Sequence, residues 1–402
     1  MDHTFSECPD WLVTELKRKG GSVTFAEFMD IALNNPNHGS YSSGSLKIGP
    51  QGDFVTSPSL GPDFSELLSS QIIDWFNQLF RTHSNCHKFS LVDIGPGEGD
   101  LSFHLLKAIE RISPKMLKKL ELVLVEPNLG MRNKQQDKLS SISNLSIRWS
   151  SLKELEDKPI IGIMIANELL DALPVDRLIF NNNKLFMQTI KLINYNEKYF
   201  IDFSKVPIPN DIELELSNAR DELGINIPPK NTPEGWSTEW HSSLNSWFEL
   251  ASNSIKDGAL LVIDYILSSE KYYSLTRREG TIVGYSKQNI CMNILENVGL
   301  IDITSHLCFE TILYNAERNK WNYLGSCKQG EALLSLGLSQ RLNSLQRLPV
   351  SELSLALTSR ESMLRLVDPM CLGNFTWIVF YKNNENLISS LDEQILFLKE
   401  PI

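Results

Sequence analysis

Residues 89–109 constrain the fold of this chain more than any other stretch. An apolar run over residues 89–94 contains Asp93 and leads into a turn with three glycines at alternate positions, Gly95, Gly97 and Gly99. Apolar residues then recur at helical spacing, so the order predicts a strand, a tight turn and a helix. Glycines let the backbone approach a ligand, and the start of a helix offers free N–H groups. The stretch therefore predicts an α/β protein with a nucleotide-like cofactor site.

A second apolar run ends at an acidic residue, Glu126. A carboxylate at the tip of the second strand of such a unit commonly accepts the two hydroxyls of a ribose. A dinucleotide fingerprint spaces its glycines as G-x-G-x-x-G, whereas this chain has G-x-G-x-G. The closer spacing, with Asp93 just before it, favours S-adenosylmethionine (SAM), which has no pyrophosphate, over a nicotinamide dinucleotide. The alternative is an ordinary glycine turn, and the two features together count against it.

The composition is that of a soluble globular protein. The 402 residues suffice for one large domain with insertions or for two domains, and 42% of them are hydrophobic. The net charge of −11 argues against a nucleic-acid partner, because binding to phosphates needs clustered Lys and Arg. No apolar stretch is long enough for a membrane span.

The cysteines and the N-terminal sequence bear on the compartment. The six cysteines have no C-x-x-C spacing, which fits free thiols in a reducing environment. The first ten residues resemble neither a signal peptide nor an Arg-rich transit sequence, so we expect a cytoplasmic protein. The cluster His83, Cys86 and His87 could hold a metal, but it lacks a fourth partner and a solvated loop is favoured.

Strands and helices alternate in the middle of the chain, which predicts a parallel sheet covered by helices on both faces. The expected strands are 89–94, 121–126, 145–149, 159–166, 259–265 and 374–381. Before them we expect helices over residues 10–35, with Thr24 as an N-cap, and over residues 62–80. Residues 38–62, rich in Gly, Ser and Pro, form a loop long enough to be functional.

The second half of the chain contains departures from this alternation. Residues 176–203 predict a hairpin or small meander on the rim, and residues 205–235 an exposed loop or lid. A Trp-rich helix is expected from 236 to 256, and its three tryptophans are assigned to packing. Two helices are expected to frame residues 301–309, and residues 331–366 are expected to be wholly helical.

Two carboxylates, Glu168 and Asp171, follow the buried strand 159–166 and the intervening Asn167. Ligands of open α/β sheets bind at the carboxyl ends of the strands, so both acids are candidates for the cleft. Paired carboxylates can hold a guanidinium in a fixed orientation and stabilise its charge during methyl transfer. Helix capping explains the same residues equally well. Asp264 and Tyr265, at the tip of another strand, are open to the same two interpretations.

These residues resemble the MidA family of SAM-dependent methyltransferases, which includes mitochondrial protein-arginine methyltransferases that assist assembly of respiratory complex I. The resemblance runs from about Val23 to Phe380. The matching blocks are Thr24–Met29, Gly52–Pro58, Asp93–Gly99, Ala166–Val175, Ile263–Tyr265, Gly280–Thr281 and Asp302–His306.

The resemblance implies an α/β class I methyltransferase core, Rossmann-like, with a mostly parallel seven-stranded sheet whose last strand is antiparallel. An N-terminal helical segment and rim insertions would complete it. The implied boundaries are an N-terminal helical segment and Gly-rich loop closing on the cofactor site (1–88), the core (89–382) with an insertion around 177–235, and a C-terminal tail (383–402).

The resemblance also implies where ligands bind. SAM would contact Asp93, Gly95, Pro96, Gly97, Gly99 and Glu126. The loop over the cofactor would contribute Gly52, Asp53, Phe54, Thr56 and Ser57. The acceptor pocket would be lined by Asn167, which would also contact SAM, and by Glu168 and Asp171. The substrate side would include Asp264, Tyr265 and His306.

The chain departs from the family pattern in the segments on the substrate side. Ile266 stands where the family usually has Gly, residues 282–288, ending at Gln288, lack the usual His, and Cys308 replaces an acid found in many members. The cofactor turn has no such departure. Cofactor binding is therefore better supported than any particular acceptor.

We therefore expect a SAM-dependent methyltransferase acting on an arginine of a protein substrate, with a respiratory-type dehydrogenase subunit as the candidate that kinship implies. Glu168, with Asp171, would clamp the guanidinium. The alternatives are a small-molecule methyltransferase, which needs a narrow acceptor pocket, and a non-catalytic assembly factor with a SAM-like site. A nicotinamide oxidoreductase is disfavoured by the glycine spacing.

Overall fold

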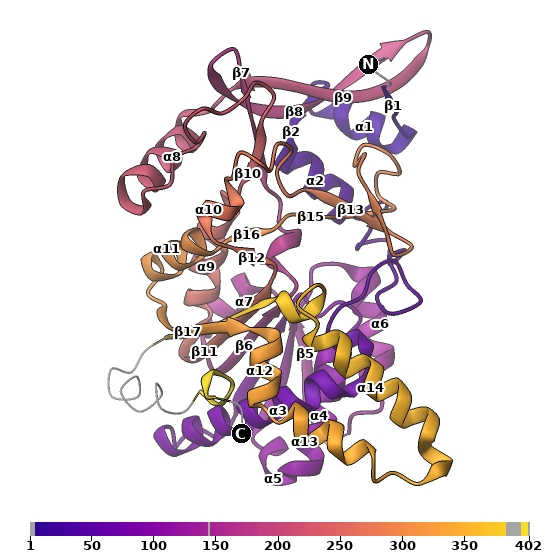
Figure 1. Ribbon diagram of the computed structural model, residues 1–402, viewed down its shortest axis with the longest axis vertical. Coiled ribbons are helices and arrows are strands. Elements are labelled where there is room, and N and C mark those ends of the chain that lie inside the picture. Colours follow the sequence, from indigo (N-terminus) through magenta and orange to yellow (C-terminus); the bar gives the residue numbers. More distant parts are fainter. Residues whose placement is uncertain (1–4, 144, 383–394, 401–402) are drawn as a thin grey trace.

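A seven-stranded sheet forms the lower half of the molecule in the computed structural model, which describes residues 5–143, 145–382 and 395–400 (Figure 1). The strand order is β17-β18-β11-β6-β3-β4-β5. The five strands from β11 to β5 are parallel, and β18 runs antiparallel to both of its neighbours. The bounds are β3 (Phe89–Ile94), β4 (Leu120–Val125), β5 (Ser146–Ser150), β6 (Ile160–Asn167), β11 (Ile255–Asp264), β17 (Asn322–Lys328) and β18 (Thr376–Lys382). A mostly parallel sheet with an antiparallel last strand, as expected from the sequence, is thus present.

Alternate side chains of the central strands enter two separate hydrophobic cores. On β3, Leu91 packs into one core and Val92 into the other, and Ile165 and Ala166 divide in the same way on β6. Both faces are therefore covered, which explains why these strands are continuously apolar rather than alternating with polar residues.

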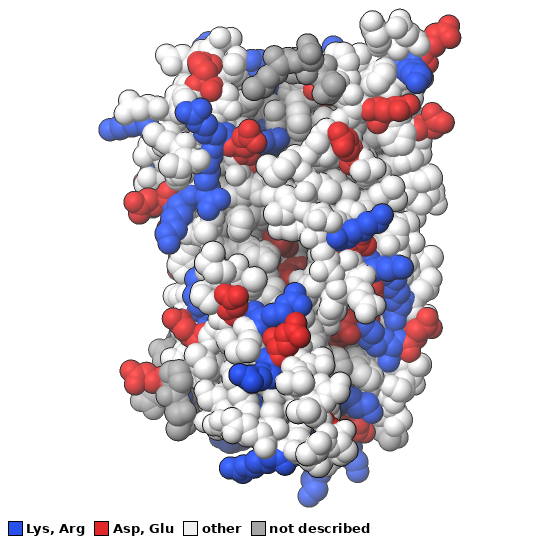
Figure 2. Space-filling model, turned by 45° about the vertical axis from the view of Figure 1, so that its right-hand side comes forward, with Lys and Arg blue, Asp and Glu red and all other residues white. Residues whose placement is uncertain are grey.

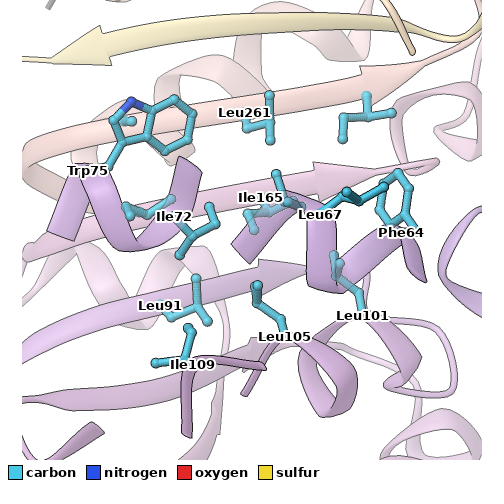
Figure 3. Packing of buried hydrophobic residues seen from close by; sticks show 14 of the residues in the cluster. Phe64, Leu67, Ile72, Trp75, Leu91, Leu101, Leu105, Ile109, Ile165 and Leu261 are labelled. Atoms are coloured by element: carbon cyan, nitrogen blue, oxygen red, sulfur yellow. The ribbon is translucent and has the colours of Figure 1, made fainter. Parts of the chain in front are cut away.

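Helices α3 (Pro62–Thr82) and α4 (Asp100–Ile112) cover one face of this sheet. Figure 3 shows Phe64, Leu67, Ile72 and Trp75 of α3 packed close to strand residues such as Leu91 and Ile165. Helices α12 (Gln329–Ser335) and α14 (Leu353–Val367) extend the same layer, with α13 (Leu338–Leu345) beside them. The opposite face is covered by α7 (Leu152–Glu156), α9 (Ser243–Asn253) and α11 (Phe309–Arg318).

A second, mostly antiparallel sheet forms the upper half of the molecule (Figure 1). Its strands are β1 (Ser6–Glu7), β9 (Lys198–Pro207), β8 (Lys184–Tyr195), β7 (Asp176–Asn181) and β10 (Ser237–Trp240), with β2 (Ser22–Thr24) paired to β8. Helices α1 (Asp10–Arg18) and α2 (Phe25–Asn34) pack against it. Thr24 caps α2 through a capping box with Glu27, so its predicted role is confirmed.

Further helices and strands lie outside these two sheets. They are α5 (Pro114–Leu117), α6 (Leu129–Leu139), α8 (Asn210–Leu223), α10 (Ser269–Tyr272), the pair β12 (Ile266–Leu267) and β16 (Leu307–Cys308), and a small sheet of β13 (Val283–Ser286), β14 (Asn289–Cys291) and β15 (Asp302–Thr304). The hairpin predicted around Asn181–Asn183 is confirmed, because β7 turns into β8 there.

Several expected elements were wrong in detail. Strand β2 interrupts the helix expected over residues 10–35, and the loop expected over 205–235 contains α8. The helix expected from Trp236 starts only at Ser243, because residues 237–240 pair with β7. The packing role of the tryptophans holds: Trp236, Trp240 and Trp247 are all buried.

The last part of the chain differs as well. Residues 331–366 are divided among three helices, with a break at Gly337, whose φ is +99°. Strand β17 was missed, and residues 301–309 form two short strands followed by α11, with β14 rather than a long helix before them. Most of the predicted tail, residues 383–394 and 401–402, lies outside the described residues, while Ile395 and Phe397 pack into the core below the sheet.

Candidate functional site

A cavity of about 420 Å³ lies at the carboxyl ends of β3, β4, β5 and β6. The glycine turn after β3 forms one wall. The Gly-, Ser- and Pro-rich loop between α2 and α3 forms another, with Ile48, Phe54, Thr56 and Pro58 among the lining residues. Figure 2 shows acidic side chains recessed in a hollow between the upper and the lower half of the molecule. The cavity is thus in the position where open α/β sheets bind ligands.

The glycine turn requires glycine for steric reasons at two positions. Gly95 and Gly97 have φ angles of +69° and +54°. A Cβ on Gly97 would lie 2.9 Å from Cδ1 of Ile48, and one on Gly95 would lie 2.5 Å from Cδ1 of Leu169. Gly95, Pro96 and Gly97 line the cavity, whereas Gly99 is the N-cap residue of α4 and lies outside the lining. Three of the four predicted turn residues are therefore in the wall.

Asp93 and Glu126 are both buried and both line the cavity. The hydroxyl of Ser102 donates to Asp93 over 2.7 Å, and the backbone N–H of Asn128 donates to Glu126 over 2.9 Å. Burial raises the pKa of each carboxyl to about 7, against the opposing effect of these donors. Two predicted cofactor residues thus offer acceptors at adjacent strand ends.

Glu168 directly follows the last residue of β6. Its backbone φ is +51°, an uncommon value for a residue other than glycine. Its Oε1 accepts hydrogen bonds from the backbone N–H of Ser57 (2.9 Å) and from Nδ2 of Asn167 (3.1 Å). Oδ1 of Asn167 is buried without a partner among the described residues. Burial raises the pKa of Glu168 to about 8. Glu168 and Asn167 both line the cavity, as predicted.

Asp171 and Asp264 are buried but do not line the cavity. Oδ2 of Asp264 accepts from the backbone N–H groups of Leu170 (2.9 Å) and Asp171 (3.3 Å), and its Oδ1 accepts from that of Tyr265. Asp264 therefore stabilises the turn after β6, and its predicted place on the substrate side stays a prediction. Burial raises the pKa of Asp171 well above its usual value, and the neighbouring Asp264 adds to this. Of the two predicted acids, Glu168 lines this cavity, and the predicted role of Asp171 stays a prediction.

Tyr265 and His306 are also absent from the wall of this cavity, and their predicted place on the substrate side stays a prediction. The ring of Tyr265 packs on Phe375 with centroids 4.0 Å apart and meets His306 edge-on at 5.5 Å. Burial lowers the pKa of His306 to about 4, so its imidazole is neutral at pH 7. Both side chains pack beside the site rather than in it.

Only part of the predicted cofactor loop contacts the cavity. Phe54 and Thr56 line it, whereas Gly52, Asp53 and Ser57 do not. The carboxylate of Asp53 accepts from the backbone N–H groups of Lys47 and Lys287, both over 3.0 Å. A Cβ on Gly52 would lie 2.1 Å from the carbonyl oxygen of Lys47. Asp53 and Gly52 therefore shape the loop instead of facing a ligand.

The three departures from the family pattern lie outside the cavity wall. Ile266 and Cys308 are buried where β12 pairs with β16. The backbone N–H of Gln288 donates to the carbonyl oxygen of Asp53 over 2.7 Å. These three residues therefore contribute to the structure around the cavity rather than to its lining.

Sequence reasoning missed several lining residues, among them Tyr41, Ile48, Arg132, Ser150 and Ser151. Ser150 ends a parallel strand next to β4, so the strand-end rule could have found it. Ile48 carries no such signal, because its position depends on how the long loop folds back over the turn.

No group of three or more His, Cys, Asp or Glu side chains is placed to hold a metal within residues 5–143, 145–382 and 395–400. His83, one member of the cluster considered above, pairs with Asp257 over 2.9 Å. None of the six cysteines forms a disulfide. Among the described residues, no helix combines the length and the hydropathy that crossing a membrane requires.

The comparisons with known proteins agree with this geometry. Residues 67–327 match a family described as "Putative S-adenosyl-L-methionine-dependent methyltransferase". The Drosophila melanogaster mitochondrial protein arginine methyltransferase NDUFAF7 homolog is 24% identical over 88% of this chain and 80% of its own length. Human mitochondrial protein arginine methyltransferase NDUFAF7 is 26% identical over 81% of this chain and 72% of its own length.

A crystal structure from Burkholderia thailandensis, bound to S-adenosyl-homocysteine, has a similar fold. It superposes with a TM-score of 0.76 at 24% sequence identity, covering 92% of this chain and 90% of that one.

Proposed function

The chain belongs to this family of SAM-dependent methyltransferases, as its resemblance to the MidA family indicates, and we propose that it methylates an arginine of a protein substrate. The observation that carries the proposal is the position of Glu168, a partly buried carboxyl in the cavity wall directly after β6. The curated relatives, named protein arginine methyltransferases, support the same acceptor.

The residues present fit SAM. The cavity wall contains the acceptor groups Asp93, Glu126, Glu168 and Asn167, and Oδ1 of Asn167 is buried with its acceptor unused by the described residues. Such a wall suits a ligand with positive charge and several donors, as SAM has in its sulfonium, amino and hydroxyl groups. Gly97 leaves open the space that a Cβ would fill.

SAM supplies an electrophilic methyl group when bound. Glu126, at the end of β4, would hold the ribose hydroxyls, and Asp93 and Asn167 would orient the remainder of the molecule. The turn from Gly95 to Gly97 would contact it through backbone, while Phe54 and Thr56 would limit the access of water from the loop side.

Glu168 would bind the acceptor. A guanidinium remains charged at any physiological pH, and its approach favours the ionised carboxylate. A charge-assisted hydrogen bond from the guanidinium to Glu168 fixes the orientation of one nitrogen and stabilises the positive charge of the product. The two donors already on Oε1 leave Oε2 of Glu168 for this contact.

The substrate protein would be a subunit of a respiratory-type dehydrogenase complex. Support comes from the resemblance to the MidA family, which includes methyltransferases that assist assembly of respiratory complex I. The cytoplasmic location expected from the sequence stays a prediction.

The substitution Glu168→Gln tests the proposal. We expect it to abolish methyl transfer to protein arginine while S-adenosyl-homocysteine binds with unchanged affinity in calorimetry. The assay incubates purified protein with labelled SAM and an extract of cells lacking the protein, and mass spectrometry identifies the modified residue. Full transfer by the Gln variant, or a label on a small molecule only, would overturn the proposal.

A further inference from the structure

Gln329, the first residue of α12, is fully buried and held from three sides. Its backbone N–H donates to the carbonyl of Phe375 (2.9 Å), and its Nε2 donates to the carbonyl of Leu366 (3.1 Å). The indole N–H of Trp377 donates to its Oε1 over 3.2 Å. The side-chain amide therefore has one fixed orientation.

The same amide holds Ser57, which is also fully buried. Oγ of Ser57 lies 3.0 Å from Nε2 and 3.2 Å from Oε1 of Gln329. The backbone N–H of Ser57 in turn donates to Oε1 of Glu168 over 2.9 Å. Hydrogen bonds thus link Trp377 to Gln329 and Gln329 to the hydroxyl of Ser57. The backbone N–H of Ser57 then links this residue to Glu168.

Gln329 does not itself line the cavity, so it acts only through Ser57. Ser57 belongs to the long loop between α2 and α3. Its backbone N–H must point at the Glu168 carboxylate to donate a hydrogen bond to it. A hydrogen bond bends and weakens when its donor rotates by tens of degrees, so the orientation of the Ser57 backbone decides its strength.

We propose that Gln329 is a positioning residue, which holds Ser57 so that its backbone N–H keeps the Glu168 carboxylate ready for the acceptor. The proposal rests on the proposed function, since it takes Glu168 as the group that binds the acceptor.

The consequence is measurable as a pKa. Burial raises the pKa of Glu168 to about 8, and the backbone N–H and the side chain of Ser57 both oppose this by stabilising the ionised carboxylate. The other ionisable groups that face Glu168 are Asp171, Asp264 and Tyr265. No hydrogen bond joins Gln329 to any of these three side chains, and its hydrogen-bonded link to Glu168 runs through Ser57.

The experiment compares Gln329→Leu and Ser57→Ala with the unaltered protein. Carbon NMR on protein labelled in its glutamate carboxyls follows the titration of Glu168, whose signal is identified by its loss in Glu168→Gln. We expect the pKa of Glu168 to rise by about one unit in both variants, as loss of a hydrogen bond to a charged group would cause. The rising limb of the pH–rate profile of methyl transfer should move by the same amount.

Gln71 provides a matched control. It is a fully buried glutamine on α3 whose Oε1 accepts from the backbone N–H of Leu396 over 2.6 Å, away from the cavity. Gln71→Leu should lower stability without moving the pKa of Glu168 or the pH profile.

An unchanged Glu168 pKa in folded Gln329→Leu and Ser57→Ala would overturn the inference. If Gln329→Leu does not fold, Gln329→Met decides in its place, because it keeps the length of the side chain without the amide, whereas Ser57→Ala also removes a side chain that itself lowers the pKa of Glu168. A failure of the proposed function would give a different result. Glu168→Gln would then keep full activity, while the NMR titration would still show that Gln329 affects the pKa of Glu168.

Discussion

The carboxylate of Asp264 at the end of β11 accepts a hydrogen bond of 2.9 Å from the backbone N–H of Leu170, in the turn that follows β6. The two strands are neighbours in the sheet, so the contact ties the ends of two parallel strands together. The backbone of Glu168 sits in the same turn, and its N–H donates to the carbonyl of Ile263 on β11. The geometry of Glu168 therefore depends on β11 as much as on its own strand.

Replacing Asp264 by Ala should destabilise this turn. The backbone N–H groups of Leu170 and Asp171 would lose their acceptor in a buried place, at a cost of about 3 kcal/mol in the free energy of unfolding. Urea denaturation measures the loss. Asp264→Asn keeps one acceptor oxygen and should lose less. An unfolding midpoint of Asp264→Ala equal to that of the unaltered protein would contradict this role.

Replacing Glu126 by Ala should weaken cofactor binding. The variant loses an acceptor for the ribose hydroxyls, so we expect the Kd for S-adenosyl-homocysteine to rise roughly ten- to hundredfold in calorimetry. Glu110→Gln, an exposed change on α4, removes the same formal charge far from the cavity wall and controls for bulk electrostatics. Equal affinities in Glu126→Ala and in the control would show that Glu126 does not contact the cofactor.

The position of the glycine turn in the fold could be predicted from the sequence, because a strand, a glycine turn and a helix are determined locally. Asp93, Gly97 and Glu126 lie in the wall as expected. The sequence does not show which carboxylates at strand ends reach the cavity wall, because packing between distant segments decides this. Asp171 and Asp264 both lie at the ends of buried strands. Only the structure of the turn after β6 shows that the carboxylate of Asp264 already accepts hydrogen bonds from backbone N–H groups.

The fold shows the same division. Strands with continuous apolar runs, such as β3 and β6, were found, since burial on both faces leaves a clear signal. Strand β17 was missed because its residues are mostly half-buried and polar, and its pairing with β18 is a long-range contact. Strand β10 was taken for helix because Trp236 and Trp240 are spaced by four positions, and its pairing with β7 overrides that period.

The stability of the ligand-free protein should fall as the pH rises from about 4.5 to 8. Burial raises the pKa values of Asp93 and Glu126 to about 7 and that of Glu168 to about 8, so in this range the folded state binds more protons than the unfolded state. The free energy of unfolding then decreases with pH. Urea midpoints at pH 5.5 and pH 8 measure this, and the decrease should be smaller in Glu168→Gln. A midpoint that rises with pH would contradict the assigned directions.

Replacing Gly97 by Ala should reduce cofactor affinity more than stability. Its φ of +54° disfavours a side chain, and the new Cβ would lie 2.9 Å from Cδ1 of Ile48, in the wall that the cofactor contacts. Gly20→Ala is the control, because Gly20 has a φ of +86° but no atom within 4 Å of its would-be Cβ. Both variants should lose about 1 kcal/mol of stability from backbone strain. Only Gly97→Ala should raise the Kd for S-adenosyl-homocysteine, by about tenfold or more, and equal Kd values in the two variants would mean that the turn does not contact the cofactor.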